Sequence, residues 1–228
     1  YDFVADTLDE KITAETLLAA IDVVQRYVTD AAWPSPEILD TLSAAPTIVE
    51  LGAYLGHKTV RFGELVQPLG GRVLAVEMMP DNFELLQENI KANNLSDTVD
   101  VRQVGIWNKR GIVRGVSKGR QRRSIHQLAQ LQGGDEFEAE VTTLSELLSD
   151  WNHSPIGLVF ATINGAEVEM LEGFGATDHD VKSWFIAAPY EGDGNGLTGA
   201  EYCHDRLVEM GAPPLTGRGR RRIEAILP

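Results

Sequence analysis

The fold is decided by residues 47–59, which read TIVELGAYLGHKT. The first five residues form a short apolar run containing one acid, a pattern typical of a buried strand. A turn with Gly52 and Gly56 follows, and we expect a helix from about Lys58 to Val66. A strand that passes through a glycine turn into a helix is the opening unit of a parallel, doubly wound sheet.

The alternation of strand and helix continues downstream. Further strands are expected at 72–77, 99–104, 112–117, 137–142, 156–163 and 184–188, with an edge strand at 221–227. Helices are expected at 81–93, 143–150, 165–173 and 199–210. This order predicts an α/β protein with a doubly wound, mostly parallel, Rossmann-like sheet and right-handed crossovers.

The first 45 residues differ from this pattern. Apolar residues at helical spacing predict a helix over residues 9–30, and Ser35 followed by Pro36 predicts the start of a short helix that runs through Leu42. We therefore expect an N-terminal helical cap over residues 1–45 and a single domain over residues 46–228.

The composition is that of a globular protein, with 43% hydrophobic and 24% charged residues among 228. There is no apolar run of the roughly 18 residues that a spanning helix needs, and no signal peptide is visible, so we expect no membrane span. The single cysteine, Cys203, fits a reducing compartment, and the expected location is the cytoplasm.

Acids outnumber bases by 34 to 20, which gives a net charge of −14 and disfavours a surface that binds nucleic acid as a whole. The bases are nevertheless concentrated: seven lie in residues 109–123 and four in residues 218–222. Two interpretations stay open. The segments are either solvated loops or arginine-rich sites for an anionic substrate.

The turn after the first strand indicates the kind of ligand. It lacks the G-x-G-x-x-G pattern of dinucleotide-binding proteins, so NAD is a minor alternative. Glu50 at the strand tip would repel a pyrophosphate and attract an ammonium or sulfonium group. Glu77 ends the second strand, where an acid can accept both hydroxyls of a ribose. A nucleoside with a cationic amino-acid tail satisfies both acids, and this describes S-adenosylmethionine.

Four blocks in the same order carry a resemblance to a known family. They are residues 47–59, residues 77–90 (EMMPDNFELLQENI), residues 141–144 (VTTL) and residues 165–173 (GAEVEMLEG). The second block is similar to the family pattern E-P-x-P-x-x-F-x-x-L-x-x-N, with Met78 in place of the first proline. The chain resembles the FkbM-type methyltransferases, class I enzymes that typically methylate hydroxyl oxygens of sugars and secondary metabolites.

The resemblance implies a cofactor site for S-adenosylmethionine. Glu50 would face the methionyl ammonium and Glu77 the ribose, while Thr59 would reach the cofactor carboxylate. The adenine is expected against Met78 and the region of Ile106. The expected cofactor residues are Glu50, Gly52, Ala53, Gly56, Thr59, Glu77, Met78 and Ile106.

One segment departs from the family pattern. The fourth strand usually ends K-I-D-V-E-G, whereas residues 160–165 here read FATING, so Thr162 and Asn164 stand where the pattern has acids. In the resemblance these acids lie beside the cofactor methyl and the substrate. Their replacement argues against a magnesium-assisted mechanism, and we expect no metal. Thr162 and Asn164 remain candidates to orient a hydroxyl by hydrogen bonding.

Methyl transfer from a sulfonium is an in-line displacement, in which positioning lowers most of the barrier. If a base takes part, His126 is one candidate because its segment resembles a serine-rich region near the substrate. Glu191, after the fifth strand, is a second candidate.

The sequence thus predicts an S-adenosylmethionine-dependent methyltransferase that acts without metal on a hydroxyl of a small-molecule or glycan acceptor, including an anionic one. One alternative is an RNA-directed methyltransferase that uses segments 109–123 and 218–222. Another alternative is a catalytically inactive scaffold that binds the cofactor.

Overall fold

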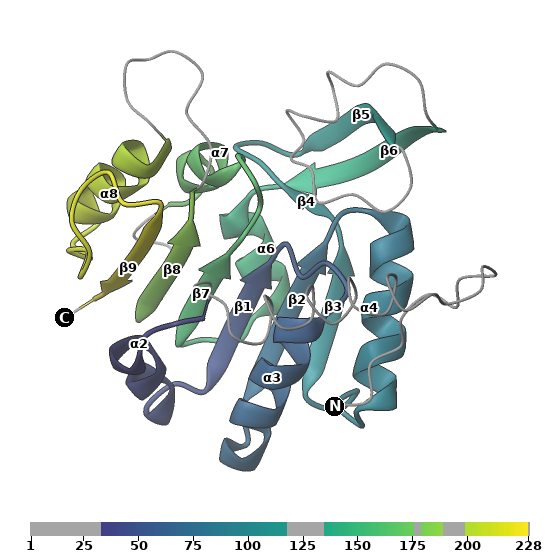
Figure 1. The fold of residues 1–228 in the computed structure, drawn as a ribbon, viewed down its shortest axis with the longest axis horizontal. Helices are drawn as coiled ribbons and strands as arrows, with labels where there is room; N and C mark the ends of the chain where they lie inside the picture. Colours follow the sequence, from purple (N-terminus) through teal and green to yellow (C-terminus); the bar gives the residue numbers. More distant parts are fainter. Residues whose placement is uncertain (1–32, 118–134, 176–178, 189–198, 228) are drawn as a thin grey trace, which may run out of the picture.

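A computed structural model describes residues 33–117, 135–175, 179–188 and 199–227, which are built around a six-stranded sheet (Figure 1). The strand order is β3-β2-β1-β7-β8-β9. The last strand pairs antiparallel with its neighbour and the others are parallel. The strands are β1 (Thr47–Leu51), β2 (Arg72–Glu77), β3 (Val99–Gln103), β7 (Leu158–Ala161), β8 (Ser183–Ala187) and β9 (Arg222–Ile226). The predicted doubly wound, mostly parallel sheet is confirmed.

The chain order in the sheet reverses between β1 and β7. From β1 the chain continues through β2 to β3 on one side, and it later fills the other side with β7 and β8. Leu51 at the end of β1 pairs with Ala161 at the end of β7. In open α/β sheets, ligands bind outside the carboxyl ends of the strands at such a switch point. The turn after β1 and the loop after β7 are therefore the place to look for a site.

Helices cover both faces of the sheet (Figure 1). Buried side chains from α2, α3 and α4 share one apolar core with the sheet, and those from α6, α7 and α8 share the other. The helices are α2 (Pro36–Asp40), α3 (His57–Val66), α4 (Pro80–Ala92), α6 (Leu144–Trp151), α7 (Glu167–Glu172) and α8 (Gly199–Glu209), with two short 3₁₀ helices, η1 (Thr41–Ser43) and η2 (Gln67–Leu69).

A second, three-stranded sheet follows β3 in the chain. It consists of β4 (Gly105–Ile106), β5 (Gly111–Ser117) and β6 (Asp135–Thr142) in the order β4-β6-β5. Figure 1 shows it above the carboxyl end of β3, beside the top of α4. The strands expected at 112–117 and 137–142 are thus confirmed, and their separation from the main sheet is a feature that the pattern did not predict.

The N-terminal segment is shorter and more irregular than expected where it is described. The helix predicted through Leu42 ends as α2 at Asp40 and continues as η1. Ser35 is at the cap position, but its side chain makes no capping hydrogen bond. Instead its backbone N–H donates to Glu224 of β9 at 2.9 Å. The helix expected over 9–30 lies outside the described residues, and a domain division at residue 45 stays a prediction.

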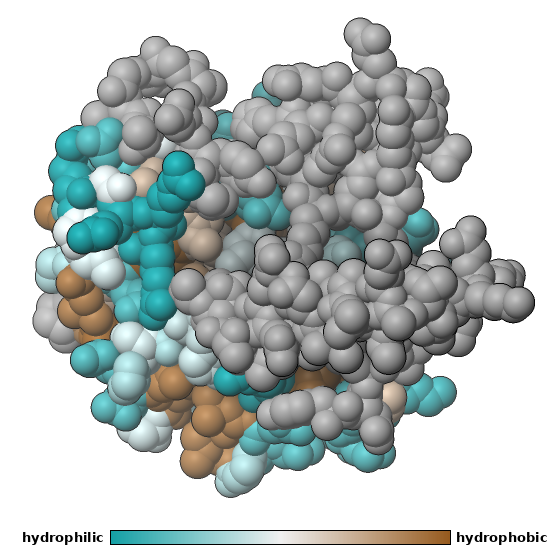
Figure 2. Space-filling view, viewed as in Figure 1, coloured by the Kyte–Doolittle hydropathy of each residue, from teal (hydrophilic) through white to brown (hydrophobic). Residues whose placement is uncertain are grey.

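Arginines of the second basic segment take part in internal ion pairs. The Arg218 guanidinium donates to Asp205 and Glu201 of α8, and Arg222 donates to Glu224. Figure 2 shows strongly hydrophilic side chains on the described surface around α8. Two of the four basic residues in 218–222 therefore form ion pairs with carboxylates of the same chain.

Among the described residues, every helix falls short of the length or apolarity needed to cross a bilayer.

Gly157, just before β7, is a position where packing leaves no room for a side chain. A Cβ there would lie 1.9 Å from the carbonyl oxygen of Ala45. We expect Gly157→Ala to lower the free energy of unfolding by about 3 kcal/mol, because backbone must move to relieve the overlap. Gly217→Ala is the matched control, because no atom of the described residues lies within 4 Å of a Cβ built there. Urea unfolding of both variants tests this, and equal midpoints would contradict it.

Candidate active site

The turn after β1 is fixed by hydrogen bonds to the neighbouring strand and by residues in the left-handed region. The N–H groups of Gly52 and Ala53 both donate to the carbonyl of Val76 at 2.9 Å. Gly52 has φ +81° and Gly56 has φ +86°. A Cβ on Gly52 would lie 2.5 Å from the carbonyl oxygen of Thr162, so glycine is required both by conformation and by the close approach of the loop after β7.

Glu50 is buried beneath this turn, with 1% of its surface exposed. The Thr59 hydroxyl of α3 donates to its Oε2 at 2.5 Å. Burial raises the pKa of Glu50 to about 7, against the opposing effects of the Thr59 hydrogen bond and the nearby Lys58 charge. Because burial outweighs the effects of Thr59 and Lys58 on this pKa, a further cation beside Glu50 would stabilise its ionised form.

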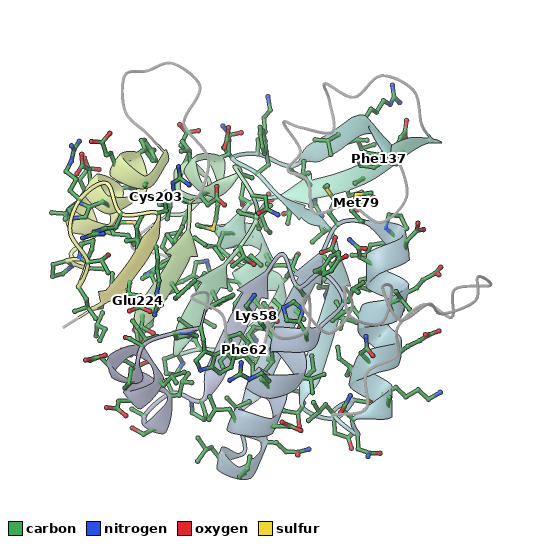
Figure 3. All side chains as sticks on the ribbon, in the orientation of Figure 1. Lys58, Phe62, Met79, Phe137, Cys203 and Glu224 are labelled. Atoms are coloured by element: carbon green, nitrogen blue, oxygen red, sulfur yellow. The ribbon has the colours of Figure 1, made fainter. Side chains whose placement is uncertain are left out.

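Lys58 supplies the positive charge close to Glu50. It lies at the first turn of α3, is 7% exposed, and places its Nζ 5.7 Å from the ring centre of Phe160 (Figure 3). Phe160 pairs with Glu50 across β1 and β7, so both side chains lie on the same face of the sheet. Phe160 also stands where the family pattern has lysine. In this chain the buried cation therefore comes from the helix rather than from the strand.

Glu77, at the tip of β2, connects the glycine turn to α4. Its Oε2 accepts from the Tyr54 N–H at 2.8 Å, and its Oε1 accepts from the Met79 N–H at 2.8 Å and from Asn82 at 3.4 Å. Burial raises the pKa of Glu77, and the hydrogen bonds oppose that effect. An ionised carboxylate has about four acceptor positions. With three occupied, a ribose could use both of its hydroxyls only by displacing the long Asn82 contact.

Met78 and Ile106, expected beside the adenine, differ in their surroundings. Met78 is half-buried, and its sulfur would lie 2.9 Å from a Cβ built on Gly105. Ile106 is 4% exposed and belongs to the core shared with α6. The two residues are brought to the same region by the junction of β2 with the second sheet.

The loop after β7 carries Thr162 and Asn164. The Thr162 N–H donates to the Leu51 carbonyl at 2.9 Å, and its hydroxyl donates to the Gly52 carbonyl at 3.4 Å. Asn164 has φ +54° and Gly165 has φ +110°. These neutral side chains lie in the loop that faces the glycine turn. His126 and Glu191 lie outside the described residues.

One acid at this edge was not singled out by the sequence analysis. Glu167 begins α7, is 3% exposed, and accepts from the Gly165 N–H through Oε2 at 2.7 Å. Its position in the block GAEVEMLEG, two residues after Gly165, was the available signal, because it is the acid closest in sequence to Thr162 and Asn164. Within the described part of the chain, no three His, Cys, Asp or Glu side chains gather as a metal site would require.

The fold and this arrangement define a doubly wound α/β domain with two buried acids beside a glycine turn at the switch point. A family described as the methyltransferase FkbM domain matches residues 50–191, more than half of the chain. The chain belongs to the FkbM methyltransferase family.

Comparisons with individual proteins are more limited. The chain is similar to catechol O-methyltransferase of Sus scrofa, with 35% identity over 68 residues, which cover 28% of this chain and 36% of that protein. Among solved structures it is similar to methyltransferase FkbM from Methylobacillus flagellatus KT, with 16% identity, a TM-score of 0.44, and coverage of 63% of this chain and 33% of that one. It is also similar to the O-methyltransferase TomG from Streptomyces achromogenes, with 12% identity, a TM-score of 0.49, and coverage of 97% and 93%. The chain thus spans about a third of the length of the first two proteins.

The raised pKa of Glu50 makes its contribution to stability dependent on pH. The folded-state pKa, about 7, lies above the ordinary value of 4.5, so the folded protein binds this proton more tightly than the unfolded chain. Stability from this group is present below about pH 4.5 and is lost as the pH rises to about 7. We expect Glu50→Gln to stabilise the protein by about 3 kcal/mol at pH 8 and hardly at all at pH 4.5.

Chemical unfolding at both pH values tests this expectation. Glu64→Gln, an exposed position on α3, is the control and should behave alike at the two pH values. A Glu50→Gln protein that is no more stable than wild type at pH 8 would show that the carboxylate carries no burial cost.

Proposed function

We propose that this chain binds S-adenosylmethionine at the switch point and transfers its methyl group to a hydroxyl oxygen of a small-molecule or glycan acceptor. The observation that carries the proposal is the buried Glu50 carboxylate beneath the glycine turn, with Glu77 at the tip of the next strand. Membership of the FkbM methyltransferase family supports the class of reaction.

The residues fit the cofactor in charge and in space. Glu50 is stabilised as a carboxylate by a further cation, which matches an amino-acid ammonium. Gly52 provides backbone without a side chain where the turn meets the β7 loop. Glu77 retains acceptor capacity for a ribose hydroxyl. Thr59 already donates its proton to Glu50, so a cofactor carboxylate would have to compete for that hydroxyl.

When bound, S-adenosylmethionine supplies a methyl group activated by a positively charged sulfur. The chain then has to hold an acceptor oxygen in line with that group, since alignment provides most of the rate enhancement. The loop after β7 is the proposed place, because its Thr162 carbonyl lies directly against the glycine turn. Asn164 and Thr162 are proposed to orient the acceptor hydroxyl as neutral hydrogen-bonding groups.

Oxygen as the accepting atom is supported by the family resemblance and by the name of the relative in Sus scrofa, an O-methyltransferase of catechol. Catechol is therefore one member of the acceptor panel below, together with phenol and methyl glucoside. We propose neither NAD as the cofactor nor RNA as the acceptor.

Cofactor binding is the first test. S-adenosylhomocysteine at about a hundredfold excess over its dissociation constant should stabilise the protein by about 2.7 kcal/mol, a rise in Tm of about 5 to 11 °C. NAD should give no rise. We expect Glu77→Ala to abolish the shift, because it removes the acceptor for the ribose, whereas Glu88→Ala, on the exposed side of α4, should keep it.

Urea unfolding of Glu77→Ala without ligand separates lost binding from lost folding. A wild-type protein with an unchanged Tm in S-adenosylhomocysteine would overturn the proposal.

Metal independence is the second test. We propose that transfer needs no divalent cation, since neutral Thr162 and Asn164 stand where carboxylates would be expected to hold one. Tritium from methyl-labelled S-adenosylmethionine should be transferred to a hydroxyl of a panel member at the same rate in excess EDTA as with added Mg²⁺. A rate that disappears in EDTA and returns with Mg²⁺ would contradict this, and cofactor binding without transfer to any panel member would indicate a scaffold.

A further inference from the structure

Glu167 is a buried carboxylate with an unused acceptor. Its Oε2 accepts from the Gly165 N–H at 2.7 Å, while its Oε1 is buried and has no hydrogen-bond partner among the residues that the structure describes. The residue is 3% exposed. Leaving a buried charged oxygen without a donor is costly, so such a group in a native structure indicates either strain or a missing ligand.

The position of Glu167 favours a ligand. The residue follows the loop of residues 162–166, whose first carbonyl lies against the glycine turn at Gly52. The hydrogen bond from Gly165 shows that the carboxylate turns back toward this loop rather than away from the sheet edge. Asn164 and Gly165 both have positive φ, so the bond forms where the loop backbone leaves the conformations that most residues adopt. The carboxylate that carries the unpartnered oxygen therefore lies next to the loop in which we place the acceptor.

We propose that Glu167 is the catalytic residue that receives the proton of the acceptor hydroxyl. This inference rests on the proposed function. The hydroxyl donates to Oε1 and so gives the buried oxygen its missing partner. As the bond from the acceptor oxygen to the methyl carbon forms, the bond from that carbon to sulfur breaks and sulfur keeps the electron pair. The hydroxyl proton passes to Oε1, which leaves a neutral carboxylic acid, a methyl ether and a thioether.

The electrostatic surroundings suit a base. Burial, with a smaller contribution from Glu169 on the same helix, raises the pKa of Glu167 to about 7 against the opposing effect of nearby backbone N–H groups, that of Gly165 among them. Cys203 of α8 interacts electrostatically with Glu167, and the pKa of this thiol is raised by burial and by the charges of Glu167 and Glu169. A base is most effective when its pKa is near the working pH.

The test compares Glu167→Gln with wild type. Glutamine keeps an acceptor for the Gly165 N–H but cannot take a proton. Glu172→Gln, an exposed position on the same helix, is the matched control. The measurements are the rate of label transfer to catechol, phenol and methyl glucoside between about pH 5.5 and 9, the dissociation constant of S-adenosylhomocysteine by calorimetry, and Tm at pH 5 and pH 8.

We expect Glu167→Gln to lose about 100-fold or more in kcat, with the affinity for S-adenosylhomocysteine within about twofold of wild type. The wild-type rate should rise with pH through about 7, and the variant should lack this rise. The variant should also gain Tm relative to wild type at pH 8 but not at pH 5, because a buried charge is removed.

A Glu167→Gln protein with wild-type kcat and pH profile overturns the inference. Failure of wild type to bind S-adenosylhomocysteine, or to methylate any panel member, rejects the proposed function itself and the inference with it. If Glu167→Gln fails to fold, Glu167→Asp replaces it, since aspartate keeps the charge but shortens the reach. Unchanged kcat in that variant would likewise reject the assignment.

Discussion

The burial of Glu50 is the constraint on which the site depends. The Glu50 carboxylate is only 1% exposed. It is buried because β1 lies between two other strands, β2 and β7, in a sheet that is covered on both faces. Water cannot solvate it there, so the protein has to supply donors and charge, through the Thr59 hydroxyl and the nearby Lys58. These groups do not fully offset the cost of burying the charge, so a cationic ligand would stabilise the ionised Glu50 further.

Lys58 of α3 lies over the ring of Phe160 in β7, which brings a cation from the helix to this strand position. Phe160 extends an apolar layer, in which its ring stacks on Phe185 at 4.4 Å and meets Phe62 edge to face at 5.2 Å. The lysine of the family pattern at this strand position would interrupt that layer. A lysine from α3 instead reaches over the ring and keeps a cation near the buried glutamate.

Charge in and after the loop that follows β7, where we propose that the acceptor binds, is arranged differently. The loop after β7 has neutral Thr162 and Asn164, and the acid of this region is carried by the helix that follows, as Glu167. Glu167 is the first residue of this helix, and its carboxylate accepts from the Gly165 N–H in the loop just before the helix. Glu167 is therefore a buried acid next to a strand end that has neutral residues at the two positions where the family pattern has acids.

The sequence by itself determined the main sheet and its order of elements, because hydrophobic periodicity and glycine turns are local signals. It also singled out two acids close to strand ends, Glu50 in the last two residues of β1 and Glu77 at the end of β2, and both are buried. Only the tertiary structure decided the separate sheet of β4, β5 and β6, the approach of Lys58 to Phe160, and the half-bonded carboxylate of Glu167. These features depend on contacts between segments far apart in the chain, which no local pattern encodes.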